Sequence, residues 1–262
     1  YPIRLGDLLV MDLDGKALPE TCIWSNQPDM RLQDLVCVGL GADRFYHRPI
    51  FQNGWVSKTE SWRCVLAIDP AGRGKDELAW AVLAELNGNL FLLESGGSTL
   101  GYADEVLQYL SETAKKWDVN YVVAESNMGD GMFSALLKPH LTRTHPCTIE
   151  EVRHNIRKEE RLCDTLGPLI QQHRLIVNSR VIKNDYRLTD EDPEHGYSRS
   201  LFWQASRLTQ ERNCLSHDDR LDALAIAVGF FVESAAQDQQ VQQQHRKDQL
   251  FQDELEAWMD ET

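Results

Sequence analysis

Three aspartates near the end of the chain, Asp218, Asp219 and Asp222, carry the clearest chemical signal in the sequence. Their spacing predicts a helix that begins at Ser216, because serine caps helices well and acids suit the positive end of the helix dipole. At about 100° per residue, the three carboxylates fall together on the flank of an apolar stripe. Capping explains Asp218 and Asp219 but not Asp222, and adjacent carboxylates repel each other unless a cation lies among them. The cluster therefore favours a bound divalent metal ion.

Two further acids each follow a short apolar run that is typical of a buried strand. Asp69 comes after residues 64–68, and Glu125 comes after residues 121–124. Because ligand sites of α/β proteins form at the carboxyl ends of strands, we expect these acids to meet the late aspartates at one sheet edge. Taken singly, Asp69 before a proline is also typical of a turn, and Glu125 also suits a cap or an arginine pair. The order of strand end, strand end and helix favours a shared site.

Carboxylate oxygens of this kind select Mg²⁺ or Mn²⁺ over Zn²⁺. Two such ions, about 3.5–4 Å apart, can activate a water molecule and stabilise the leaving oxygen of a phosphodiester. The predicted metal ligands are Asp69, Glu125, Asp218, Asp219 and Asp222, and all of these except Asp218 are also predicted to be catalytic.

Basic residues close to these acids in the sequence are candidates for contacting DNA phosphates. The turn at residues 72–75 lacks the GxxxxGK[ST] spacing of a phosphate-binding loop, although its bases remain available for DNA. A second basic group surrounds the start of a helix predicted over residues 158–172, where its members either line a DNA groove or pair with Glu159 and Glu160. The predicted DNA-binding residues are Arg73, Lys75, Arg153, Arg157, Lys158 and Arg161.

Composition sets limits on the class of protein. The chain has 262 residues, 42% of them hydrophobic, and no apolar run of membrane-spanning length. Its six cysteines form no CxxC pair, which argues against a disulfide framework and a structural zinc site and indicates a reducing compartment. A net charge of −14 argues against nucleic acid as a partner, but only in part, because a DNA groove needs only local bases. The first residue is Tyr1, which suggests a fragment of a longer protein.

The remaining patterns predict an α/β sheet flanked by helices. Strands are expected at residues 7–11, 35–40, 64–68, 78–86, 90–94, 121–124, 148–152 and 175–177, with a hairpin at Asn87 and Gly88. Helices are expected at residues 102–117, 132–137 and 158–172, and a polar loop at residues 187–198. Residues 1–60 are predicted to be a connecting subdomain, residues 61–235 the main domain, and residues 236–262 a polar tail. The apolar stripe of the last helix comprises Leu221, Leu224, Val228 and Phe231.

Four segments of the chain resemble a known family, the nuclease domain of the large terminase subunit of tailed bacteriophages, especially its podovirus branch. The segments are IDPAGRGKDE at 68–77, ESNMGDGMF at 125–133, CDTL at 163–166 and HDDRLDAL at 217–224. The resemblance implies an RNase H-like fold of the RuvC/integrase type, with a mixed central sheet flanked by helices. It also implies a metal-dependent endonuclease that cuts concatemeric double-stranded DNA with two Mg²⁺ or Mn²⁺ ions.

The resemblance also implies roles and partners. Asp69 and Glu125 correspond to the strand ligands, and the late aspartates supply the third. RuvC-type resolvases end in a similar Asp-x-x-Asp helix, which points to Asp219 and Asp222, whereas other terminases use one of the adjacent pair, so Asp218 stays open. The implied partners are double-stranded DNA, the portal protein, the small terminase subunit and an ATPase domain of the same full-length chain, in the cytoplasm of the host and without a membrane.

Other functions remain open from the sequence. A junction resolvase of the same fold would prefer four-way junctions over linear duplex. An actin-like or sugar-kinase ATPase would need a later glycine-rich phosphate turn, which the sequence lacks. A non-catalytic module that docks the motor to the portal would bind no metal and cut no DNA.

Overall fold

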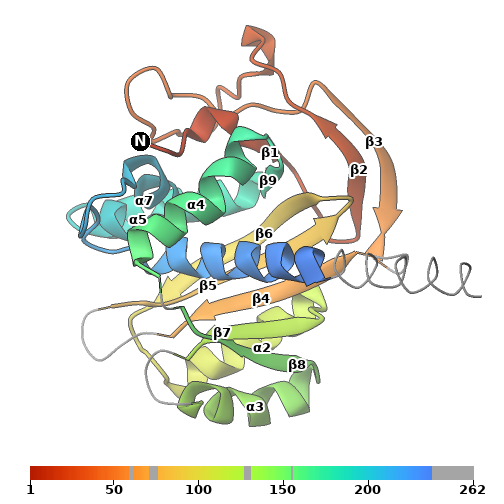
Figure 1. The fold of residues 1–262 in the computed structure, drawn as a ribbon, viewed down its shortest axis with the longest axis vertical. Helices are drawn as coiled ribbons and strands as arrows, with labels where there is room; N and C mark the ends of the chain where they lie inside the picture. The colour runs from red at the N-terminus through yellow and green to blue at the C-terminus, as the bar shows by residue number, and fades with distance from the viewer. Residues whose placement is uncertain (59–61, 71–75, 127–130, 155, 238–262) are drawn as a thin grey trace, which may run out of the picture. The chain divides into compact units, whose positions relative to one another are not determined.

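The computed structural model describes residues 1–58, 62–70, 76–126, 131–154 and 156–237. Its central feature is a seven-stranded sheet with the strand order β1-β9-β6-β5-β4-β7-β8 (Figure 1). The strands are β1 (Leu9–Met11), β4 (Arg63–Asp69), β5 (Leu78–Leu86), β6 (Asn89–Ser98), β7 (Tyr121–Glu125), β8 (Thr148–Val152) and β9 (Leu175–Asn178).

The sheet is mixed because one strand runs against all the others. β5 pairs antiparallel with both β4 and β6, whereas β1, β9 and β6 are mutually parallel, as are β4, β7 and β8. The reversal at the β5–β6 turn is local, because Asn87 and Gly88 have φ angles of 52° and 78°, which suit a tight hairpin. The predicted hairpin is therefore confirmed. Because the six strands other than β5 run in the same direction, their carboxyl ends lie at one edge of the sheet.

Helices cover the two faces of the sheet. Those of more than four residues are α2 (Asp104–Trp117), α3 (Met132–Thr144), α4 (Lys158–Gln171), α5 (Ser179–Glu191), α7 (Leu201–Arg207) and a helix over residues 219–237. One large core joins α2 and α3 to alternate residues of the central strands, among them Leu66, Ile68 and Ala124. Residues 219–228 of the last helix lie over the opposite face (Figure 1), and Leu221, Leu224 and Val228 of its predicted stripe are buried.

The first 58 residues contribute both to this sheet and to a second one. β1 pairs with β9 at the edge of the main sheet, whereas β2 (Ala17–Ile23) and β3 (Phe51–Ser57) form a separate antiparallel pair. The strand predicted at residues 35–40 is absent. That segment instead bends through Gly41, whose φ is +61°, so that the Asp43 carboxylate accepts hydrogen bonds from the Leu5 and Gly6 amides. The short helices η1 (Leu5–Asp7) and η2 (Pro28–Met30) flank this region.

Two helical predictions need correction. α3 continues to Thr144, seven residues beyond its predicted end, and the loop predicted at residues 187–198 is mostly α5 and α6 (Gly196–Arg199). α5 is amphipathic, with Val181 and Ile182 buried, and the Asn178 side chain caps it by accepting from the Arg180 amide. Packing of this apolar face stabilises the helix, although most residues of the segment are polar.

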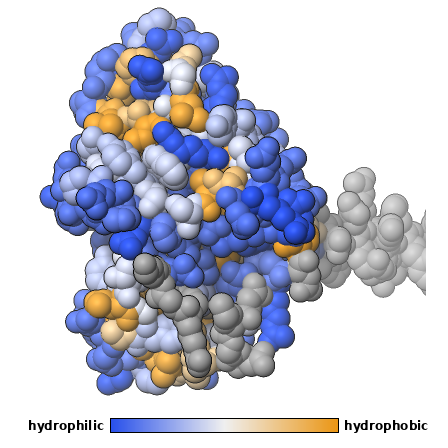
Figure 2. Space-filling view, turned by 90° about the vertical axis from the view of Figure 1, so that its left-hand side faces the viewer, coloured by the Kyte–Doolittle hydropathy of each residue, from blue (hydrophilic) through white to orange (hydrophobic). Residues whose placement is uncertain are grey.

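By packing, the chain divides into two compact units, Tyr1–Val228 and Gly229–Thr262. The face of the molecule shown in Figure 2 is mostly hydrophilic, with apolar residues in separate small patches. Within the described ranges, no helix is long and apolar enough to span a membrane.

Candidate metal centre

Asp69 and Glu125 end two neighbouring parallel strands. Ile68 of β4 lies opposite Ala124 of β7, so the next residue on each strand is an acid, and adjacent strands are about 5 Å apart. Ile68 and Ala124 point into the core beneath α2 and α3. Because successive side chains of a strand point to opposite faces, both acids lie on the face that carries the helix starting at residue 219.

The late acids occupy the first turn of that helix. The helix begins at residue 219, three residues after the predicted cap at Ser216. The cap comes from elsewhere in the fold, because the Leu221 amide donates to Oε1 of the buried Gln204 on α7, at 3.1 Å. Asp219 is 8% exposed and Asp222 only 1%, whereas the side chain of Asp218 is 26% exposed.

Two basic residues of α4 supply the cations among these acids. Lys158 Nζ lies 2.7 Å from Asp218 Oδ1 and also forms an ion pair with Asp222 Oδ2. Arg161 Nη2 donates to Asp222 Oδ1 at 2.6 Å. Burial alone would lower the pKa of Lys158, but attraction to Asp222 and Asp218 raises it above the usual value. Lys158 and Arg161 thus pair with acids about 60 residues away and not with Glu159 or Glu160.

Asp69 lies close enough to these acids for their charges to affect its pKa. Burial raises the pKa of Asp69 well above its usual value, and repulsion from Asp222, Glu125 and Asp219 adds to the rise. Burial, together with the nearby Asp218, raises the pKa of Asp219 to about 6. Burial also raises the pKa of Asp222, against the opposing effect of Lys158 and Arg161. The fold therefore gathers these carboxyl groups in a buried place, where each disfavours the charged form of its neighbours.

The donor set matches a hard divalent cation. Its members are carboxylates from two strand ends and one helix start, and such oxygen ligands suit Mg²⁺ or Mn²⁺. Burial, and then repulsion from neighbouring carboxylates, raises the pKa of Asp69, and a bound divalent ion would favour the charged form again. Among the described residues, no three acidic, histidine or cysteine side chains are arranged closely enough to hold one ion as they stand. Which of the five predicted acids ligate metal therefore stays a prediction.

The other predicted DNA contacts have separate surroundings. Arg153 Nε donates to the Ser126 hydroxyl at 3.1 Å, next to Glu125, and the exposed Arg157 donates to the Gln210 carbonyl at 2.9 Å. Arg73 and Lys75 lie outside the described residues. Contact of any of these residues with DNA stays a prediction.

Sequence reasoning missed three charged residues that support the site. Arg220, Glu77 and Asp185 are each at most 5% exposed and form one buried ion network. Glu77 and Arg220 both lie inside segments that resemble the terminase family. Their residue types alone are also typical of solvent-exposed charges, and only the structure shows that both are buried. The position of Arg220 between the predicted ligands Asp219 and Asp222 was the one sequence feature that pointed to this network.

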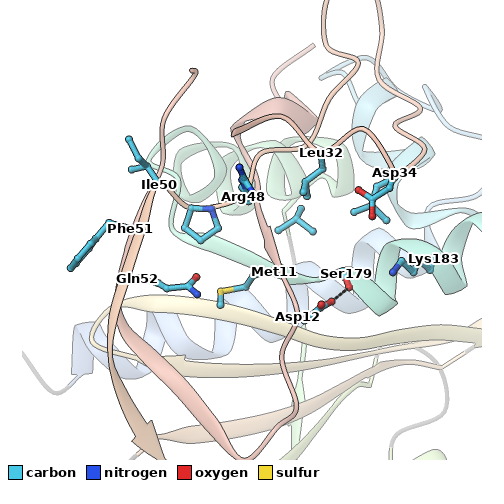
Figure 3. A pocket seen from close by; sticks show the side chains of 13 residues that line it. Met11, Asp12, Leu32, Asp34, Arg48, Ile50, Phe51, Gln52, Ser179 and Lys183 are labelled. Atoms are coloured by element: carbon cyan, nitrogen blue, oxygen red, sulfur yellow. Dashed lines mark hydrogen bonds between the residues drawn. The ribbon is translucent and has the colours of Figure 1, made fainter. Parts of the chain in front are cut away.

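The molecule also has a hollow of about 410 Å³ beside β1 and the start of α5 (Figure 3). Its lining includes the polar pair Asp12 and Ser179, which are hydrogen-bonded, and the apolar residues Met11 and Phe51. None of the predicted site residues lines it. This hollow is thus distinct from the acidic cluster.

The chain is similar to large terminase subunits. A family model described as the ribonuclease H-like domain of the bacteriophage T7 terminase matches residues 68–175. The large terminase subunit of Enterobacteria phage T3 is 41% identical over 233 residues. Residues 68–175 belong to the terminase RNase H-like family. The resemblance and the fold class inferred from the sequence are both confirmed.

The alignment with the T3 subunit covers most of this chain but less than half of that subunit. The aligned region is 88% of this chain but only 39% of the length of the T3 subunit. Among solved structures, an Mn-soaked, inhibitor-bound human cytomegalovirus terminase nuclease domain has a TM-score of 0.47 at 11% identity, over 66% of this chain and 85% of that one. The large terminase nuclease of the thermophilic phage G20c has a TM-score of 0.41 at 16% identity, over 64% and 82%.

Proposed function

We propose that this chain is a metal-dependent endonuclease of a DNA-packaging terminase, which hydrolyses phosphodiester bonds of concatemeric double-stranded DNA. One observation carries the proposal most directly. Asp69 and Glu125 end adjacent parallel strands on the face that bears Asp219 and Asp222, in a domain of the terminase RNase H-like family.

In the proposed mechanism, Asp69, Glu125 and Asp219 hold two Mg²⁺ or Mn²⁺ ions, and Asp218 or Asp222 completes the set. The bound ions supply Lewis acidity and a water of lowered pKa. Arg161 and Lys158 hold the Asp222 carboxylate in place. Burial of Asp69, Asp219 and Asp222 places these carboxyl groups in surroundings of low dielectric constant, where their charge would act strongly on a bound cation.

The partners follow from the relationship to large terminase subunits and are part of the proposal. Double-stranded DNA is the substrate, and the portal protein and small terminase subunit are assembly partners, in the cytoplasm of the host. An ATPase domain of the same full-length chain is a further partner in this proposal. Residues 1–60 connect to that domain and also supply β1 at the edge of the sheet, residues 61–235 form the rest of the nuclease domain, and residues 236–262 are a polar tail by composition.

The test is nicking and linearisation of supercoiled plasmid by the purified chain with Mg²⁺ or Mn²⁺, and with EDTA as the blank. Asp69→Asn and Glu125→Gln should each lower the rate at least a hundredfold, because each removes one charged ligand. Glu150→Gln is the matched control, since Glu150 is exposed on β8. Full activity of either site variant would refute the assignment. Preference for four-way junctions over plasmid would instead indicate a resolvase.

A further inference from the structure

A buried ion network joins the helix of the late acids to the strand that pairs with β4. The Arg220 guanidinium donates to both carboxylate oxygens of Glu77, from Nε at 3.1 Å and from Nη2 at 3.3 Å. Its third nitrogen, Nη1, lies 3.5 Å from Oδ1 of Asp185. Arg220 and Glu77 are each 4% exposed and Asp185 is 5% exposed, so solvent screens these interactions very little.

Glu77 holds the helix at two points. Its side chain binds Arg220, and its backbone amide lies 3.4 Å from Oδ2 of Asp219, the next residue. Glu77 directly precedes β5, whose residue Ala79 pairs with Asp69 of β4. The pair Glu77–Arg220 therefore links the strand pair that carries Asp69 to the helix turn that carries Asp219 and Asp222.

Asp185 anchors the same arginine from the other side. Its carboxylate accepts from the Ser200 hydroxyl at 2.6 Å and from the amides of Leu201 and Phe202 at 2.9 and 3.1 Å, at the start of α7. α7 returns to the late helix, because Gln204 accepts from the Leu221 amide. The start of the helix at residue 219 is thus held from two sides, by Glu77 and by α7 with Asp185. These groups are far away in the sequence, so no local pattern predicts the contacts.

The backbone is shaped to admit this network. A Cβ at Gly97 of β6 would lie 2.8 Å from Glu77 Oε2 and 3.1 Å from Arg220 Nε. A residue with a side chain at position 97 would displace the carboxylate or the guanidinium. The absence of a side chain there makes room for the ion pair.

We propose that Glu77 and Arg220 are positioning residues that set the distance between the strand acids and the late helix acids. The proposal rests on the proposed metal-dependent function. Neither residue ligates an ion or touches the substrate. They act through Asp219 and Asp222, as groups that hydrogen-bond to metal ligands or orient them commonly do.

The test is calorimetric titration of the purified chain with Mn²⁺ at a temperature where all variants are folded. Glu77→Gln should weaken Mn²⁺ binding 10–100-fold, as loss of a supporting group does at other metal sites. Glu85→Gln is the matched control, because Glu85 lies on the same strand and pairs with Arg63 at 3.6 Å near the surface. Hydrogen exchange of the amides at residues 219–222 should accelerate in Glu77→Gln and stay unchanged in Glu85→Gln.

Gly97→Ala keeps every charge and disturbs the same pair, so it replaces Glu77→Gln if that variant does not fold. Unchanged Mn²⁺ affinity in the folded variants, beside wild-type binding and cleavage, would overturn the positioning role and leave the nuclease function intact. Failure of the wild-type chain to bind Mn²⁺ or cut plasmid would overturn both. A purely structural role would lower thermal stability without changing the affinity of the folded fraction.

Discussion

Arg161 donates a 2.6 Å hydrogen bond to Asp222, and the two residues lie 61 positions apart on different helices. The acceptor is 1% exposed and its carboxylate also meets Lys158. The buried acid therefore depends for its charge balance on side chains of α4.

Removing the guanidinium should destabilise the fold. In Arg161→Gln, the buried Asp222 keeps only Lys158, and breaking a buried pair costs roughly 3 kcal/mol, the lower end of the usual range. Thermal denaturation should show a loss of about 6–12 °C for a chain of this size. Arg63→Gln is the control, because Arg63 is 40% exposed and its pair with Glu85 contributes under about 1 kcal/mol. Equal losses in the two variants would contradict this prediction.

Metal binding should weaken on acidification. The raised pKa of Asp219, about 6, means that this carboxyl is protonated below that pH in the metal-free chain, and a proton then competes with the ion. The rise in melting temperature caused by Mn²⁺ should be large at pH 7.5 and much smaller at pH 5.

In the metal-free chain, stability depends on pH in the opposite direction and rises on acidification. Because folding raises the pKa of Asp219 above 3.8, the charged form costs stability at neutral pH, and this cost disappears as the pH falls through about 6 toward 4. Asp219→Asn should reduce both dependences, and the part that remains comes from Asp69 and Asp222, whose pKa values are also raised. A metal-induced shift that is equally large at pH 5 and 7.5 would count against Asp219 as a ligand.

DNA binding by this chain should be weak and strongly salt-dependent, because the net charge is −14 and binding relies on local bases. Arg157→Ala should weaken binding to all sequences alike and lower the slope of log Kobs against log salt by about 0.9. Arg44→Ala, in the exposed turn near Gly41, is the control. Fluorescence anisotropy over a salt series measures both slopes, and identical slopes would exclude Arg157 from the DNA contact.

The six cysteines are free, so reductant should not change the melting temperature. Cys64 is fully buried on β4, and burial raises the pKa of its thiol to about 12. Because the thiolate is the reactive form, Cys64 should react with a thiol reagent only at the rate of unfolding. Mass spectrometry of labelled peptides with and without urea would show rapid native labelling if this assignment were wrong.

Local patterns in the sequence were sufficient for the elements that carry the acids. The apolar runs before Asp69 and Glu125 predicted buried strands, and β4 and β7 confirm them. The bounds of β5 and β8 and the turn at Asn87 and Gly88 also agree with prediction, whereas β6 runs four residues beyond its predicted end. These features are recognisable because strand alternation, helical periodicity and turn residues depend on neighbours close in the chain.

Only the tertiary structure decided which charges meet. The helix starts at residue 219, and Gln204 of α7, not Ser216, accepts from an amide of its first turn. Lys158 and Arg161 pair with late aspartates and not with Glu159 or Glu160, because α4 packs against the start of that helix. Arg220 meets Glu77 across 143 positions. The sequence by itself placed the acids at strand ends and a helix start, whereas their neutralising and positioning partners come from distant segments that only folding brings together.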